Sequence, residues 1–169
     1  MSDDIIIVRE AVLGDAETIF RFNQSLALET ENRHLPDETL RNGIRAALLE
    51  KNRLAYWMAC KSGDDPSMMG QIAVSYEWSD WRNGWIWWLQ SVYVDQPFRK
   101  QGVFRSLLNH VNTVARTSQD VIGLRLYVEH ENTPAIMTYT KLGFERSGYH
   151  VMELMWLDKT QKKKNDSLA

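Results

Sequence analysis

The stretch from residue 86 to residue 109 constrains the fold most, because a strand pattern, a basic turn and a helix pattern follow one another in it directly. Residues 86–94 are rich in aromatic and β-branched side chains and are apolar on both faces, which is typical of a strand inside a covered sheet. Pro97 ends this strand, since proline cannot donate to a ladder. From Val103 onward, apolar residues recur at the helical period. We therefore expect a central strand joined by a short turn to an amphipathic helix.

The turn places cations and a glycine at the start of that helix, namely Arg99, Lys100, Gly102 and Arg105. Cations are unfavourable there on their own, because the first helical turn already presents unpaired N–H groups and the positive end of the helix dipole. A bound phosphate or pyrophosphate would offset this charge, and the glycine would let it approach the backbone closely. The sequence thus predicts an anion site at this turn, with a solvated basic turn as the alternative.

Other chemistries fit the sequence poorly. The turn lacks the Gly-Lys-Ser/Thr of a Walker loop, and its single glycine does not make a dinucleotide fingerprint. The four histidines show no metal-ligand spacing, so no metal is expected. Cys60 lies in an apolar stretch, where a buried thiol is a poor nucleophile.

Composition bounds the class of protein. A chain of 169 residues with 44% hydrophobic content fits one compact domain, expected over residues 1–158, followed by a charged tail at 159–169. A formal charge of −2 gives no electrostatic reason to expect nucleic-acid binding, and the apolar runs are too short to span a membrane. The single cysteine excludes an internal disulfide, and the N-terminus lacks the pattern of a secretory signal, so we expect a cytoplasmic protein.

The apolar periodicity also predicts the order of the elements, β-α-α-β-β-β-α-β-α-β-β. Besides the central strand, strands are expected at 5–8, 54–60, 69–78 and 124–129, with a final hairpin made of 144–149 and 151–156. Besides the helix after the basic turn, helices are expected at about 14–29, 36–51 and 133–141.

Two motifs together resemble those of the GCN5-related N-acetyltransferase (GNAT) superfamily. Arg99 and Gly102 fit its acetyl-CoA signature, Gln/Arg-x-x-Gly-x-Gly/Ala, although Phe104 stands where the family usually has a small residue. The segment 132–144 is similar to the family's later Asn-x-x-Ala-x-x-x-Tyr-x-x-x-Gly-Phe motif. The resemblance extends over about residues 5–156. It implies the α/β GNAT fold, a mixed and mostly antiparallel sheet of about seven strands flanked by four helices.

The resemblance further implies an N-acyltransferase that uses acetyl-CoA, with the amine attacking the thioester directly in a ternary complex. Backbone groups of Val92 and Val94 are then expected to pair with the pantetheine amides like an added strand. Tyr139 is the expected general acid, because a phenol pKa near 10 lies above a thiol pKa near 8.5. The cofactor-binding residues expected from the resemblance are Val92, Tyr93, Val94, Arg99, Lys100, Gln101, Gly102, Val103, Phe104, Arg105 and Asn132.

The general base is open at this stage. Trp88 stands where some relatives carry a glutamate, and it cannot accept a proton. Glu77 is the preferred carboxylate, because its strand face is otherwise lined by small residues and tryptophans follow nearby. The alternative bases are Glu29, Glu31 and Asp80. The residues expected to border the acceptor are Glu29, Glu31, Asp80, Trp81 and Trp88.

Tryptophans beside carboxylates suit a small cationic primary amine, through cation–π contacts and charge pairing. A second hypothesis is a non-catalytic acyl-CoA-binding regulatory module, because Phe104 and Trp88 both depart from catalytic relatives. The sequence leaves a homodimer open.

Overall fold

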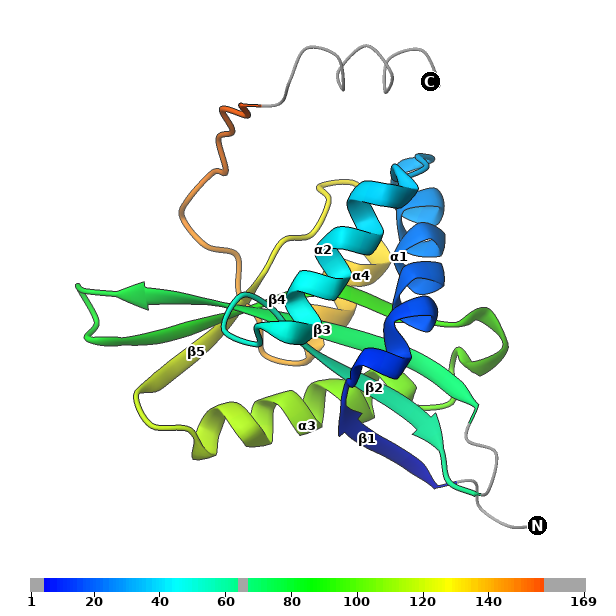
Figure 1. The fold of residues 1–169 in the computed structure, drawn as a ribbon. Coiled ribbons are helices and arrows are strands. Elements are labelled where there is room, and N and C mark those ends of the chain that lie inside the picture. The colour runs from blue at the N-terminus through cyan, green and yellow to red at the C-terminus, as the bar shows by residue number, and fades with distance from the viewer. Residues whose placement is uncertain (1–4, 64–66, 157–169) are drawn as a thin grey trace. The chain divides into compact units, whose positions relative to one another are not determined.

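The computed structural model describes residues 5–63 and 67–156, in two compact units that divide after Tyr127. The first unit is built on one sheet with the strand order β1-β2-β3-β4-β5 (Figure 1). Neighbouring strands are antiparallel from β1 to β4, and β5 is parallel to β4. The predicted mixed, mostly antiparallel sheet is therefore confirmed. Its strands are β1 (Ile6–Glu10), β2 (Ala55–Lys61), β3 (Met68–Ser79), β4 (Gly84–Val94) and β5 (Val121–Leu126).

Four α-helices were predicted, and the described residues contain four. Three lie in the first unit: α1 (Ala16–Glu31), α2 (Asp37–Leu49) and α3 (Val103–Thr117). The fourth, α4 (Thr133–Lys141), lies in the second unit. Short 3-10 turns, η1 (Leu13–Asp15) and η2 (Gln96–Phe98), precede α1 and follow β4.

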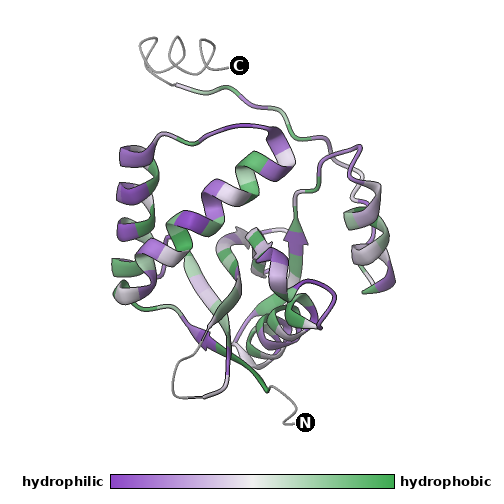
Figure 2. Ribbon diagram, turned by 90° about the vertical axis from the view of Figure 1, so that its right-hand side faces the viewer, coloured by the Kyte–Doolittle hydropathy of each residue, from purple (hydrophilic) through white to green (hydrophobic). Residues whose placement is uncertain are grey.

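Helices cover both faces of the sheet in the first unit. Helices α1 and α2 lie on one face and α3 lies on the other (Figure 1). Hydrophilic and hydrophobic residues occupy different sides of α1 and α2, as expected for helices with one face on a core (Figure 2). On the α1–α2 face, Phe22 packs with Tyr93 and with the buried side chains of β2 and β3. On the opposite face, Trp57 lies between Trp87 and His110 of α3.

A buried ion pair fixes the entry into α1. Asp15 is only 5% exposed, and both of its carboxylate oxygens accept hydrogen bonds of 2.8 Å from the Arg9 guanidinium. The same carboxylate accepts a bond from the Val12 amide at 2.8 Å. A buried carboxylate needs such partners, because an unpaired charge in this position would cost several kcal/mol. The pair therefore ties the start of α1 to β1.

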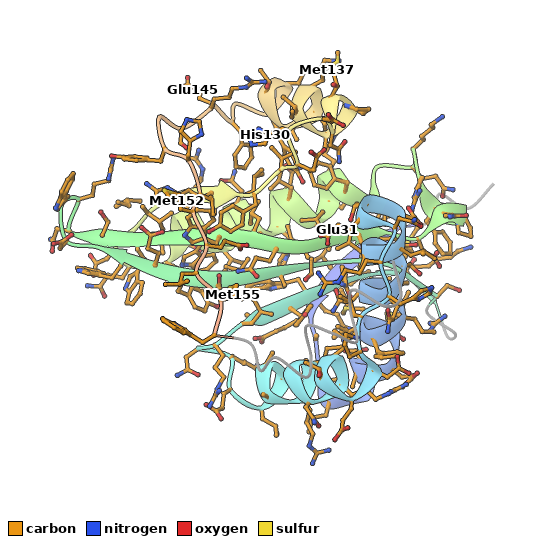
Figure 3. The ribbon with its side chains drawn as sticks, turned by 90° about the horizontal axis from the view of Figure 1, so that it is seen from above. Glu31, His130, Met137, Glu145, Met152 and Met155 are labelled. Carbon is orange, nitrogen blue, oxygen red and sulfur yellow. The ribbon has the colours of Figure 1, made fainter. Side chains whose placement is uncertain are left out.

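The predicted C-terminal hairpin is wrong, and the sheet has five strands rather than about seven. Residues 144–149 and 151–156 contain no strand, and most of their large apolar side chains face solvent, with Met152 94% and Trp156 88% exposed. Met152 and Met155 are seen on this extended segment in Figure 3. An alternating apolar pattern makes a strand only where a neighbouring strand pairs its backbone and a core covers one face. This segment has neither within the described residues. The tail at 159–169 lies outside them.

Strand β5 begins and ends about three residues earlier than predicted. Pairing with β4 decides its position, because Val121 lies opposite Trp85 and Leu126 lies opposite Leu89. The Trp85 amide also donates to the Asp120 carbonyl at 2.7 Å, which extends the contact to the turn before β5. Among the described helices, none is long and apolar enough to cross a membrane.

Candidate active site

Strand β4 is distorted where the predicted cofactor residues begin. Ser91 has a positive φ of 47°, and the register with β3 shifts between Gln71 and Ala73, as in a β-bulge. The side-chain amide of Gln71 holds the bulge in place, because it donates to the Ser91 carbonyl at 3.2 Å and to Asn23 of α1 at 2.9 Å. Asn23 in turn donates to the hydroxyl of Tyr56 at 3.3 Å. A buried polar network thus fixes the backbone of the bulge.

Beyond the bulge, β4 parts from β5. Their pairing ends at Leu89 and Leu126, whereas β4 continues to Val94. The Asp95 amide donates to Met69 of β3, while the Val94 carbonyl accepts from the Arg99 side chain at 2.9 Å. Because backbone groups of successive strand residues point to alternate sides, those of Val92 and Val94 point away from β3. An extended amide-bearing ligand fits this strand edge.

The start of α3 follows directly and carries the predicted anion site. Gly102 is its N-cap, with φ of 86°, and Lys100 also has a positive φ of 64°. This left-handed conformation suits glycine and explains why Gly102 stands here. A Cβ built on Gly102 would have no atom within 4 Å, so its outer side is open. Glycine has no side chain that could cap the first turn of α3, and the backbone N–H groups at such a helix start are suited to binding an anion.

Arg99 links the basic turn to α1. Its Nη2 atom donates to Glu29 Oε2 at 2.6 Å, and its guanidinium lies 5.6 Å from the centre of the Tyr93 ring. The other oxygen of Glu29 accepts bonds from the Tyr93 hydroxyl at 3.1 Å and from Gln96 at 3.2 Å. The structure thus brings together one residue predicted for the acceptor and two predicted for the cofactor. Sequence reasoning did not anticipate Gln96 as the third donor.

The surroundings of Glu29 and Tyr93 shift the pKa values of both side chains. Partial burial alone would raise the pKa of Glu29, but hydrogen bonds from Arg99, Gln96 and Tyr93 outweigh it and hold that pKa below its ordinary value. Burial, reinforced by the negative charge of Glu29, raises the pKa of Tyr93. At neutral pH, Glu29 is therefore an anion and Tyr93 a neutral hydrogen-bond donor.

A second polar cluster surrounds Glu77, further along β3 from the bulge. Trp88 Nε1 donates to Glu77 Oε2 at 2.5 Å, and Arg125 Nη1 of β5 lies 3.1 Å from Glu77 Oε1. Tyr127 stacks on Trp88 with ring centres 4.5 Å apart, and the Arg125 guanidinium lies 5.6 Å from the centre of the Trp88 ring. Glu77 is therefore held by one neutral and one cationic donor. Sequence reasoning missed Arg125 and Tyr127, although one cation in the apolar run of β5 was a visible signal.

The remaining residues predicted for the acceptor lie apart from these two clusters in the interactions described. Glu31, labelled in Figure 3 at the end of α1, pairs with Arg33 at 3.9 Å. Asp80 accepts a hydrogen bond from the Trp81 amide at 2.9 Å, and the Trp81 side chain is 85% exposed at the β3–β4 turn. Acceptor contacts for these three residues stay a prediction.

The second unit carries Asn132 and Tyr139. Asn132 caps α4, since its side-chain oxygen accepts from the Ala135 amide at 3.2 Å. The Tyr139 ring packs edge-on against Phe144, with centres 5.6 Å apart. Burial raises the pKa of Tyr139, so the phenol keeps its proton over a wide pH range. Within the described residues, no three His, Cys, Asp or Glu side chains are grouped to hold a metal ion.

Comparison with known proteins identifies relatives of this architecture. The sequence profile of the acetyltransferase (GNAT) family matches residues 17–144. The crystal structure of a possible acetyltransferase from Clostridium difficile 630 has 38% sequence identity and a TM-score of 0.83, covering 92% of this chain and 100% of its own. A predicted acetyltransferase with acetyl-CoA from Clostridium acetobutylicum shares the fold at 16% identity and a TM-score of 0.68, covering 93% and 98%. Among curated proteins, no match was found.

Proposed function

Because the chain belongs to the acetyltransferase (GNAT) family, we propose that it transfers an acetyl group from acetyl-CoA to a small cationic primary amine. The observation that supports the proposal best is the order of two features along the chain. The outward-pointing backbone groups of Val92 and Val94 at the end of β4 are followed, after one short turn, by the glycine-capped start of α3, whose outer side is open. A pantetheine arm fits the strand edge, and a pyrophosphate fits the helix start, where Lys100 and Arg105 add positive charge. The fold, the strand edge and the helix N-terminus are thus suited to one elongated anionic cofactor.

The proposed reaction needs no acyl-enzyme. The amine nitrogen bonds to the thioester carbonyl carbon, the carbon–sulfur bond breaks, and the thiolate leaves as free CoA after gaining a proton. The amine must lose one proton before it attacks and a second after the bond has formed. We assign the proton donated to sulfur to Tyr139, because its motif matches the family and its buried phenol stays protonated.

Glu77 remains our proposed base, and its hydrogen bonds with Trp88 and Arg125 determine how its carboxylate is oriented. Arg125 and Trp88 fix the carboxylate in one orientation, which suits a group that has to meet an incoming ammonium. The stacked Trp88 and Tyr127 rings offer an aromatic surface beside it for the cationic acceptor. The Arg125 ion pair also supports the second candidate, a non-catalytic acyl-CoA-binding module, because the Glu77 carboxylate already has a cationic partner within the protein.

Calorimetric titration with acetyl-CoA tests the cofactor assignment. Gly102→Leu should weaken binding more than tenfold, since a side chain would enter the space in front of the α3 amides. Gly63→Leu is the matched control, because Gly63 also has a positive φ, 137°, and open surroundings but lies at the β2–β3 turn. If both variants bind acetyl-CoA as the wild type does, the cofactor does not bind at α3.

A further inference from the structure

Glu29 of α1 pairs with Arg99 of the turn to which the cofactor is assigned. Its carboxylate accepts bonds from Arg99, Tyr93 and Gln96, which all come from the end of β4 and the turn after it. Arg99 is itself held toward the strand edge by its bond to the Val94 carbonyl. The ion pair therefore lies beside the edge to which the cofactor is assigned.

A negatively charged ligand at this edge cannot leave the pair unchanged. Glu29 is anionic, so a diphosphate close to Arg99 meets either repulsion from the carboxylate or an arginine already neutralised by it. The Arg99 and Glu29 side chains are 41% and 31% exposed, so the pair is partly solvated and can exchange its partner without a large loss. Carboxylate and diphosphate thus compete for the same guanidinium.

We propose that Glu29 is the exchangeable counter-ion of Arg99: the cofactor diphosphate displaces it, and the released carboxylate then binds the cationic acceptor. This inference rests on the proposed function, and it gives the two substrates an order, with acetyl-CoA binding first. Before the cofactor binds, Glu29 is held by three donors. Afterwards Oε2, the oxygen that Arg99 held, is available to the acceptor, while Tyr93 and Gln96 still hold Oε1 at the last turn of α1.

Glu29→Gln removes the competing charge while it keeps the size and a hydrogen-bonding group. The variant should bind acetyl-CoA about twofold to fivefold more tightly, the range expected for loss of a partly solvated ion pair. Inorganic pyrophosphate, titrated alone into the same protein, should show the same gain, because the competition concerns the diphosphate. With the amine that the wild type acetylates best, the KM of the amine should rise about tenfold while kcat changes little.

Glu31→Gln is the control for cofactor affinity. It removes an identical charge two residues further along α1, but Glu31 pairs with Arg33 and not with Arg99. The control should bind acetyl-CoA and pyrophosphate as the wild type does. An equal gain in both variants would mean a general charge effect and would overturn the inference.

Unchanged or weaker acetyl-CoA binding by Glu29→Gln would also overturn it, as would an unchanged KM for the amine. These results leave the proposed function standing, because the wild type would still bind the cofactor and turn over. Failure of the wild type to bind acetyl-CoA or to acetylate any amine would instead overturn the proposed function, and the inference with it.

Discussion

Replacing Gly70 with alanine should disturb the cofactor edge from inside the sheet. Gly70 lies on β3 where the end of β4 meets the first turn of α3. A Cβ added there would lie 2.6 Å from the Tyr93 carbonyl oxygen, 3.2 Å from Val94 Cα and 3.3 Å from Val103 Cγ1. Two of these atoms belong to the β4 backbone, which cannot rotate away as a side chain would. The strand that carries the outward groups of Val94 must therefore move.

The size of the effect follows from these distances. Ordinary contact begins at 3.4 Å, so the 2.6 Å contact requires a displacement of about 0.8 Å (3.4 minus 2.6). Overpacking of this kind costs about 1–3 kcal/mol. For a chain of this length, that lowers the Tm by roughly 2–12 °C. A displacement approaching 1 Å in a substrate-positioning strand lowers kcat/KM by up to about a hundredfold.

Thermal unfolding measures the change in Tm, steady-state kinetics measure kcat/KM, and calorimetric titration with acetyl-CoA measures the affinity of the cofactor edge. Gly43→Ala is the matched control: Gly43 lies in α2, its added Cβ meets nothing within 4 Å, and the change should stabilise the helix by about 0.5–1 kcal/mol. A Gly70→Ala variant with the Tm and the acetyl-CoA affinity of the wild type would refute the argument that this close contact positions the cofactor edge.

Three other predictions concern individual side chains. Asp15→Asn should destabilise the fold by roughly 2 kcal/mol at neutral pH. Burial alone would raise the pKa of Asp15, but hydrogen bonds from Arg9 and the Val12 amide hold that pKa below its ordinary value of 3.8. The stability that the ionised carboxylate contributes is therefore fully present above pH 3.8 and is lost as the pH falls further. In chemical denaturation, the difference in unfolding free energy between the wild type and Asp15→Asn should become smaller over the same pH range. Tyr139→Phe should lower kcat about a hundredfold with little change in acetyl-CoA affinity, and an unchanged kcat in steady-state assays would remove the phenol from the mechanism. Glu77→Gln should lower the rate most at low pH, where the amine is almost wholly protonated, and a pH–rate profile like that of the wild type would exclude Glu77 as the base.

The sequence predicted those parts of the fold that local pattern decides. The central strand, the helix that starts at Val103 and the helix at 133–141 each carry a strong apolar period or a proline and glycine boundary, and the structure has all three. The predicted hairpin at 144–156 had a similar alternating pattern but no partner strand in the described residues. Local pattern predicts that a segment can form a strand, whereas pairing is a tertiary property.

The candidate site shows the same division. The place of Gly102 at the helix start follows from the order strand, turn and helix, which is local, whereas the expectation for Val92 and Val94 came from the family resemblance. The Glu29–Arg99 pair joins residues 70 positions apart, and the Arg125–Glu77 pair joins residues 48 apart. No periodicity links such residues, because they come from different elements that meet only when α1 packs on β4 and β5 pairs with β4 in the folded chain. The bulge at Ser91 was equally hidden, since a positive φ at a serine has no sequence signal of its own.

Release of free thiol from acetyl-CoA in the presence of amines tests the central claim most directly. The intact protein, assayed with a panel of polyamines, aminoglycosides, amino acids and peptides, should release one thiol for each amine acetylated, fastest with a small cationic primary amine. Release that needs no amine, or acetyl-CoA binding with no acetylated product from any member of the panel, would contradict the claim and favour an acyl-CoA-binding module.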